Sequence, residues 1–163
     1  MQQQFTTKEI INVINKIRIS SILYYQNILR RRANLPDQDP KIEKFTETEQ
    51  KIENLILGCT MHNERISMII FDFLLDGRLF NKPENECVYK RIMYLHSEKM
   101  DLTKDNLVEE LKRKGELELV GGELYIEQLI TNTLSEANLR NLPNLFLSNT
   151  IIDTKHLVYY DKE

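Results

Sequence analysis

The sequence has few of the residues that all-β and disulfide-bonded proteins need. Five glycines and four prolines among 163 residues leave little material for the many tight turns of an all-β fold. The two cysteines, Cys59 and Cys87, cannot form a disulfide framework, and we expect both to be small buried side chains in a reducing compartment. No run approaches 18 apolar residues, and residues 1–5 do not begin a secretory signal. We therefore expect a cytoplasmic protein that does not contact a membrane.

The motifs of the common catalytic and cofactor sites are missing as well. The chain has no Gly-x-x-x-x-Gly-Lys-Ser/Thr segment, the loop whose backbone amides and lysine hold nucleotide phosphates. The Gly121-Gly122 pair follows no buried strand of the kind that a dinucleotide site needs. The three histidines are isolated, and neither cysteine belongs to a Cys-x-x-Cys pair, which argues against zinc. We predict no catalytic, cofactor-binding or metal-binding residue in this chain.

Charge is distributed unevenly along the chain. Residues 1–34 hold six basic residues and one acidic residue, whereas residues 45–163 hold 14 basic and 21 acidic residues. Because the main body would repel phosphates, unaided contact with nucleic acid is expected only from the first 34 residues. The neighbouring acids Glu109 and Glu110, with Lys112 close by, are expected on a solvated, salt-bridged helix face.

A long first helix is predicted by its start signal and its apolar spacing. Thr6 and Glu9 fit a capping box, and large apolar residues recur at helical spacing from there to about Ala33. Because the apolar residues cover more than one narrow stripe, the helix should be buried against the domain or, as we favour, against a second copy. Its last turn forms either a solvated helix end or a contact for phosphate or an acidic partner, through Arg30, Arg31 and Arg32.

A second capping box begins the main body of the chain. Thr46 and Glu49 open a helix there, after a linker segment at residues 34–45 that holds two of the four prolines. Residues 116–120 are expected to form a turn, and Pro143 is expected to interrupt the last helix. Further helical runs stand at about residues 64–74, 83–96, 103–114 and 124–130.

These elements predict an all-α protein, a compact bundle of about six short helices with an extra long N-terminal amphipathic helix. We divide the chain into an N-terminal helical extension and linker, residues 1–44, and a helical domain, residues 45–163. From the residues alone, the domain is a non-catalytic module for protein interactions.

The order of features in the main body carries a resemblance to a known family. A Leu-Gly pair lies in its first helix, a Phe ends a loop, an aliphatic-aromatic pair follows, and a spaced Gly-Leu-Val-Gly-Gly-Tyr-Ile-Leu pattern comes last. These features stand at Leu57-Gly58, Phe80, Val88-Tyr89, Gly115, Leu117, Val120, Gly121, Gly122, Tyr125, Ile126 and Leu129. Over about residues 46–140 the chain resembles the N-terminal domain of DnaB-type replicative DNA helicases. Gly115 suits a left-handed helix stop and Gly121-Gly122 a sharp turn, so these residues are expected to support the fold.

The resemblance implies a non-catalytic collar or scaffold domain in DNA replication. In that family, paired subunits form a collar above the motor ring and help dock primase and the helicase loader. The implied partners are therefore further copies of the chain and primase or the loader, with DNA reached only through the parent helicase. ATP and Mg²⁺ are implied only for a C-terminal ATPase domain. We expect an excised domain of a longer, ATP-dependent helicase, with a stand-alone relative as the alternative.

Two rival functions stay open at this point. A stand-alone DNA-binding or plasmid-replication regulator would use the basic helix at residues 7–33, and its binding would depend steeply on salt. A small adaptor that mimics the helicase collar would compete for its partner. A scaffold would instead present a hydrophobic surface for self-association.

Overall fold

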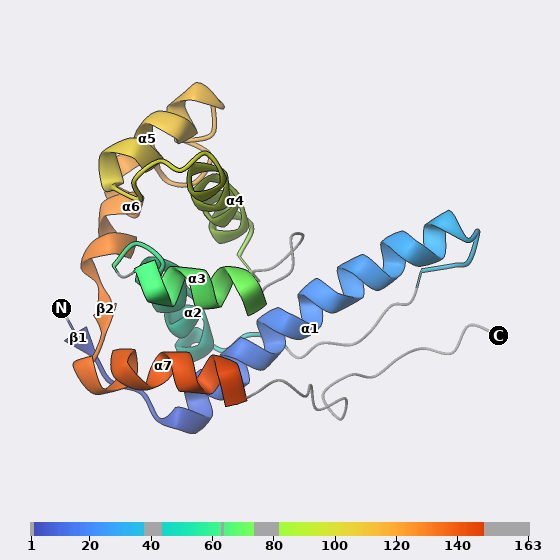
Figure 1. The fold of residues 1–163 in the computed structure, drawn as a ribbon, viewed down its shortest axis with the longest axis horizontal. Coiled ribbons are helices and arrows are strands. Elements are labelled where there is room, and N and C mark those ends of the chain that lie inside the picture. The colour runs from blue at the N-terminus through green and yellow to red at the C-terminus, as the bar shows by residue number, and fades with distance from the viewer. Residues whose placement is uncertain (1, 38–43, 63, 74–81, 149–163) are drawn as a thin grey trace.

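The structure, a computed structural model, describes residues 2–37, 44–62, 64–73 and 82–148 (Figure 1). In these ranges the chain forms seven helices, α1 (Thr7–Arg32), α2 (Glu47–Cys59), α3 (Glu64–Phe73), α4 (Pro83–Ser97), α5 (Lys104–Arg113), α6 (Gly122–Thr131) and α7 (Glu136–Ser148). Two-residue strands, β1 (Gln2–Gln3) and β2 (Thr133–Leu134), pair in parallel. The all-α prediction, six shorter helices and one long N-terminal helix, is confirmed.

Both predicted capping boxes are present and start their helices where the sequence places them. The Thr6 hydroxyl accepts a hydrogen bond from the Glu9 amide at 3.1 Å, and the Glu9 carboxylate accepts one from the Thr6 amide at 3.0 Å. Thr46 and Glu49 repeat this arrangement at 3.1 and 2.9 Å. Each box satisfies amides that have no partner inside the helix, and so it fixes the residue at which the helix begins.

Helix α2 lies at the centre of one hydrophobic core. It contacts α1, α4, α6 and β2. Every residue from Ile52 to Cys59 except Asn54 is buried. The first half of α1 packs into the same core through Ile10, Val13, Ile14 and Ile17. Our preference for burial against a second copy is therefore wrong for this half, because its apolar side chains already cover α2 and α7 of the same chain. The core includes residues from both sides of the proposed boundary at residue 44. The division of the chain into an extension and a domain stays a prediction.

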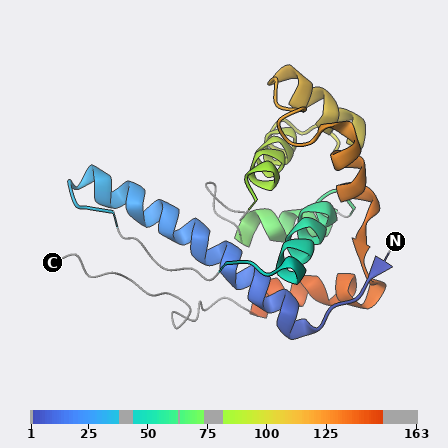
Figure 2. The ribbon, with the colours of Figure 1, turned by 180° about the vertical axis from the view of Figure 1, so that it is seen from behind.

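The second half of α1 extends away from the helical body. In both views the helix starts beneath α7 and ends at the far side of the molecule from α5 and α6 (Figures 1 and 2). Large apolar side chains remain exposed along this half and just beyond it, with exposed fractions of 42% for Tyr24, 62% for Leu29 and 49% for Leu35. The helix thus has a buried half and an open half.

The chain's N-terminal residues are joined to the connection between α6 and α7. Gln2 and Gln3 pair with Thr133 and Leu134, and the Asn138 side chain bonds both backbone groups of Phe5. The Phe5 amide donates to Asn138 Oδ1 at 2.9 Å, while Asn138 Nδ2 donates to the Phe5 carbonyl at 3.0 Å. This side-chain amide continues the backbone pairing by two more hydrogen bonds.

Pro143 lies inside α7 and does not interrupt it, which corrects the sequence prediction. Proline removes one helical N–H bond, a cost that a well-packed helix can bear. Here Leu142 and Leu145 are buried on either side of the proline and hold both halves of the helix against the body. Packing therefore overrides the local preference.

Candidate docking surfaces

The Gly115–Leu129 signature forms the turn between α5 and α6. Gly115 has φ +69°, and the Glu116 amide donates to the Leu111 carbonyl at 2.8 Å, the hydrogen bond that closes a left-handed helix stop. Residues 116–120 form a turn, as predicted, and Gly121 and Gly122 follow with φ +109° and +79°. Positive φ at two successive residues reverses the chain and lets α6 pack beside α5.

Two further signature residues, Gly58 and Leu129, meet where α2 crosses α6. A Cβ atom on Gly58 would lie 2.1 Å from the backbone oxygen of Leu129. Only glycine allows this approach, and the Leu129 side chain is buried in the core. Phe80, the remaining signature residue, lies outside the described residues.

The hydroxyl of Tyr125 connects α6 to the start of α4. It donates to Asn85 Oδ1 and accepts from Lys82 Nζ at 3.2 Å, and burial raises the pKa of this phenol. Asn85 in turn donates to the buried Glu53 carboxylate of α2 at 3.0 Å, which also accepts from the Lys82 amide at 3.1 Å. Three helices are thus tied together by polar groups beneath the surface, and the arrangement is structural.

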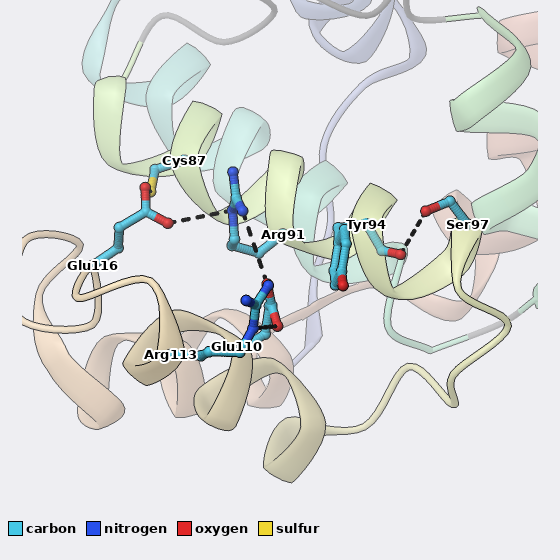
Figure 3. A network of polar contacts seen from close by, with 7 residues as sticks. All are labelled: Cys87, Arg91, Tyr94, Ser97, Glu110, Arg113 and Glu116. Atoms are coloured by element: carbon cyan, nitrogen blue, oxygen red, sulfur yellow. Dashed lines mark hydrogen bonds and ion pairs between the residues drawn. The ribbon is translucent and has the colours of Figure 1, made fainter.

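A second polar network joins α4 to α5 and to the turn that follows (Figure 3). Arg113 binds Glu110 through two hydrogen bonds of 2.7 and 2.9 Å, and Arg91 lies 3.9 Å from Glu110 and 3.3 Å from Glu116. Glu109 is exposed as expected, but the Glu110 side chain is only 7% exposed, which corrects its predicted place on a solvated face. The Arg113 hydrogen bond is the main reason that the pKa of Glu110 lies below its ordinary value.

The cysteines provide no reactive thiol. Cys59 is buried in the core, and Cys87 is half-buried and donates from Sγ to Glu116 Oε2 at 3.3 Å. Burial raises the pKa of Cys87 to about 11 and that of Cys59 to about 12, so both stay protonated at neutral pH.

Large apolar side chains are exposed at the end of the molecule formed by α5 and α6. Leu119 is 74% exposed and Leu124 is 66% exposed, beside an open hollow of about 330 Å³. We call these two leucines, with Glu118, Glu123 and Glu127, the leucine patch. Leu124 lies off the core-facing row of α6, which is formed by Tyr125, Ile126 and Leu129.

The three predicted arginines lie at the exposed end of α1. Arg30 Nε donates to the Pro36 carbonyl at 2.7 Å, and Arg31 forms a bidentate pair with Asp37. Asn34 has φ +58°, and the Leu35 amide donates to the Arg30 carbonyl at 2.8 Å, so the chain leaves the helix through a left-handed stop. We call this end, residues 24–35, the arginine tip.

In the described ranges, no three His, Cys, Asp or Glu side chains come together in a way that could hold a metal ion. No helix of the described chain is both long enough and apolar enough to cross a membrane. Its signature residues hold helices together, and large apolar side chains are exposed at the arginine tip and the leucine patch, as well as at Met68, Tyr94 and Met100. These features define a class, an all-α helical domain built around one hydrophobic core.

Comparison with known proteins gives the family. The family model described as "DnaB-like helicase N terminal domain" matches residues 46–145, and the chain belongs to this family. The crystal structure of the N-terminal domain of DnaB helicase from Mycobacterium tuberculosis has a similar fold, with a TM-score of 0.50 and 24% sequence identity. The match covers 59% of this chain and 68% of that one. No curated protein matches the sequence.

Proposed function

We propose that this chain is the non-catalytic N-terminal collar domain of a replicative DNA helicase, acting in the cytoplasm. Its copies associate with one another, and the collar docks primase, the helicase loader or both. ATP hydrolysis and DNA unwinding belong to a separate C-terminal motor domain that binds ATP and Mg²⁺. In this role the domain reaches DNA only through the parent helicase.

The observation that carries this proposal is the family match over residues 46–145, together with what its signature residues do in the fold. Gly58, Gly115, Gly121 and Gly122 allow close contacts and turns, and Tyr125 ties three helices together. A chain in which the described signature residues serve the fold is suited to positioning other proteins. Its exposed leucines and tyrosines supply the apolar contacts that such interfaces need.

The direct test measures binding to the proposed partners. Purified chain is titrated by calorimetry with primase, and separately with the helicase loader, from the same cell. We expect saturable binding to at least one of them at micromolar concentration. Gly58→Ala, which should disturb the fold, serves as the control that binding needs the folded domain. Absence of binding to both proteins would contradict the docking role.

A second function, direct DNA binding through the basic helix at residues 7–33, draws support from Arg30 and Arg32 at the exposed arginine tip. Two other cations of this helix are already engaged, because Lys16 pairs with Glu49 at 2.6 Å and Arg31 pairs with Asp37. Direct binding to duplex DNA, weakening steeply between 50 and 200 mM salt as phosphate contacts do, would favour this function over the scaffold.

A further inference from the structure

The arginine tip is a built, exposed structure. Its helix stop is closed by hydrogen bonds from Asn34 and Leu35 to backbone carbonyls of the last turn, and side chains of Arg30 and Arg31 bond Pro36 and Asp37. The tip therefore presents a fixed surface on which the apolar side chains of Leu29 and Leu35 are about half exposed or more. Its three arginines outnumber the one acid that is paired with them, so the tip is positively charged.

The leucine patch has the opposite charge around a similar apolar centre. Glu123 and Glu127 share Lys104, whose Nζ lies 3.5 and 3.8 Å from their carboxylates, and both side chains remain more than half exposed. The adjoining hollow is lined by Glu84 and Glu118 and by one lysine, Lys82. Four acids against two lysines leave this surface negatively charged, with Leu119 and Leu124 standing out from it.

The shape of the molecule decides how these two surfaces can meet. Helix α1 has 26 residues and is about 39 Å long. Its distal end lies at the opposite side of the molecule from α6, as both ribbon views show. The arginine tip therefore cannot reach the leucine patch of its own chain. A contact between them joins two copies head to tail, and such contacts form rings when their rotation closes.

We propose that the arginine tip of one copy docks on the leucine patch of a neighbouring copy. This inference rests on the proposed function, for which it names a contact between subunits. The leucines and Tyr24 supply the apolar part of the contact, and Arg30 and Arg32 face the glutamates. Because the tip belongs to the segment that precedes the family match at residues 46–145, this contact is an addition made by this chain's own N-terminal helix.

The test uses charge reversal on each side of the contact. One variant of the full chain carries Arg30→Glu and Arg32→Glu, which leaves the Arg31–Asp37 pair in place. The other carries Glu123→Lys and Glu127→Lys. Each variant alone places like charges against each other and should weaken self-association tenfold or more. In an equimolar mixture both contacts become attractive again, so the mixture should assemble as the unmodified chain does.

Sedimentation velocity over a range of protein concentrations, at low and moderate salt, gives the association constants, and circular dichroism confirms folding. Lys8→Glu with Lys44→Glu is the matched control, because both lysines are exposed and the charge change is the same. Association restored only in the mixture supports the contact. A chain that stays monomeric, association unchanged in either variant, or a mixture that stays dissociated would each overturn it. Association that persists in both variants, together with primase or loader binding, would leave the proposed function standing.

Discussion

At Gly58 the backbones of α2 and α6 come closer than any side chain permits. The atom in the way of a new methyl group is the Leu129 carbonyl oxygen, at 2.1 Å, and neighbouring backbone cannot move aside as a flexible side chain can. Gly115 poses the opposite case, because nothing lies within 4 Å of its missing Cβ but its φ is positive. The two glycines separate the effect of crowding from the effect of backbone conformation.

We expect Gly58→Ala to lower the free energy of unfolding by about 3 kcal/mol or more, because the two helices must separate. Gly115→Ala should cost only about 1–2 kcal/mol, the strain of a left-handed alanine. Thermal or urea unfolding of both variants compares them. The interpretation of Gly58 fails if its alanine variant is the more stable of the two.

Glu110 gives a prediction for the pH dependence of stability. Its folded-state pKa lies below the ordinary value of 4.5, chiefly because Arg113 hydrogen-bonds the carboxylate. The ionised group therefore stabilises the fold above pH 4.5, and this contribution is lost as the pH falls through the folded-state pKa. At pH 7, Glu110→Gln should lower the free energy of unfolding by about 1 kcal/mol, because the Arg113 partner is 54% exposed and solvent screens the pair.

Urea unfolding from pH 7 down to pH 3 measures this effect. The difference between the unmodified chain and Glu110→Gln should shrink below pH 4.5. Glu109→Gln is the control, since that side chain is 77% exposed and should change stability by less than about 0.5 kcal/mol. A difference that stays constant with pH would show that Glu110 acts through packing alone.

The roles of residues that bond to near neighbours in a helix cap or stop were predictable from the sequence. The roles of residues that contact other helices were not. Thr6, Thr46 and Gly115 lie where local rules place them, because caps and stops involve neighbours three to five positions away. The burial of Glu110 depends on Arg91, which is distant in sequence and lies on another helix. Likewise, no local pattern shows that Leu124 is exposed while Tyr125 and Ile126 face inward.

Among the elements, α7 shows most clearly how tertiary packing decides the outcome. The sequence predicted a break at Pro143, but α7 packs against both α1 and α3 and stays continuous. Its N-terminal end is held by Asn138, which is itself bonded to Ser135 and to the backbone of Phe5. Helix α7 is thus fixed by the N-terminal segment, whose pairing with the α6–α7 connection the sequence did not indicate.

Removing the Asn138 amide should release this segment. In Asn138→Ala the two bonds to Phe5 are lost, so amide hydrogen exchange should speed up for residues 2–5 and the first turn of α1. The amides of α5 and α6 should exchange as before, because they pack elsewhere. Asn144→Ala, an exposed change on the same helix, is the matched control. Unchanged exchange at residues 2–5 would mean that β1 pairing alone holds the segment.

For the whole molecule, the structure shows that deleting the N-terminal helix is a poor test of self-association. Deleting residues 1–34 would remove Ile10, Val13, Ile14 and Ile17 from the shared core, and so it would test folding as much as assembly. Point changes in the distal half of α1 keep the core intact. The sequence predicted that this helix is buried, and the structure confirms this for its first half only. Burial of the second half against another copy stays a prediction.

The whole chain should also fail to bind nucleotide. No phosphate-binding loop occurs in the sequence, so titration of the purified chain with Mg-ATP should give no saturable heat. An ATPase with such a loop, measured under the same conditions, shows that the assay detects binding. Micromolar affinity accompanied by turnover would contradict the collar-domain function.

The pairing of Gln2 with Thr133 has a consequence for folding during synthesis on the ribosome. These partners are 131 positions apart, so Gln2 is synthesised well before the residue with which it pairs. At about 5–20 residues per second, roughly 7–26 s pass between their synthesis. During this interval the face of α1 that later meets α7 has no partner in the nascent chain. Until α7 has been synthesised, this face of the N-terminal helix is therefore open to chaperones and to neighbouring nascent chains.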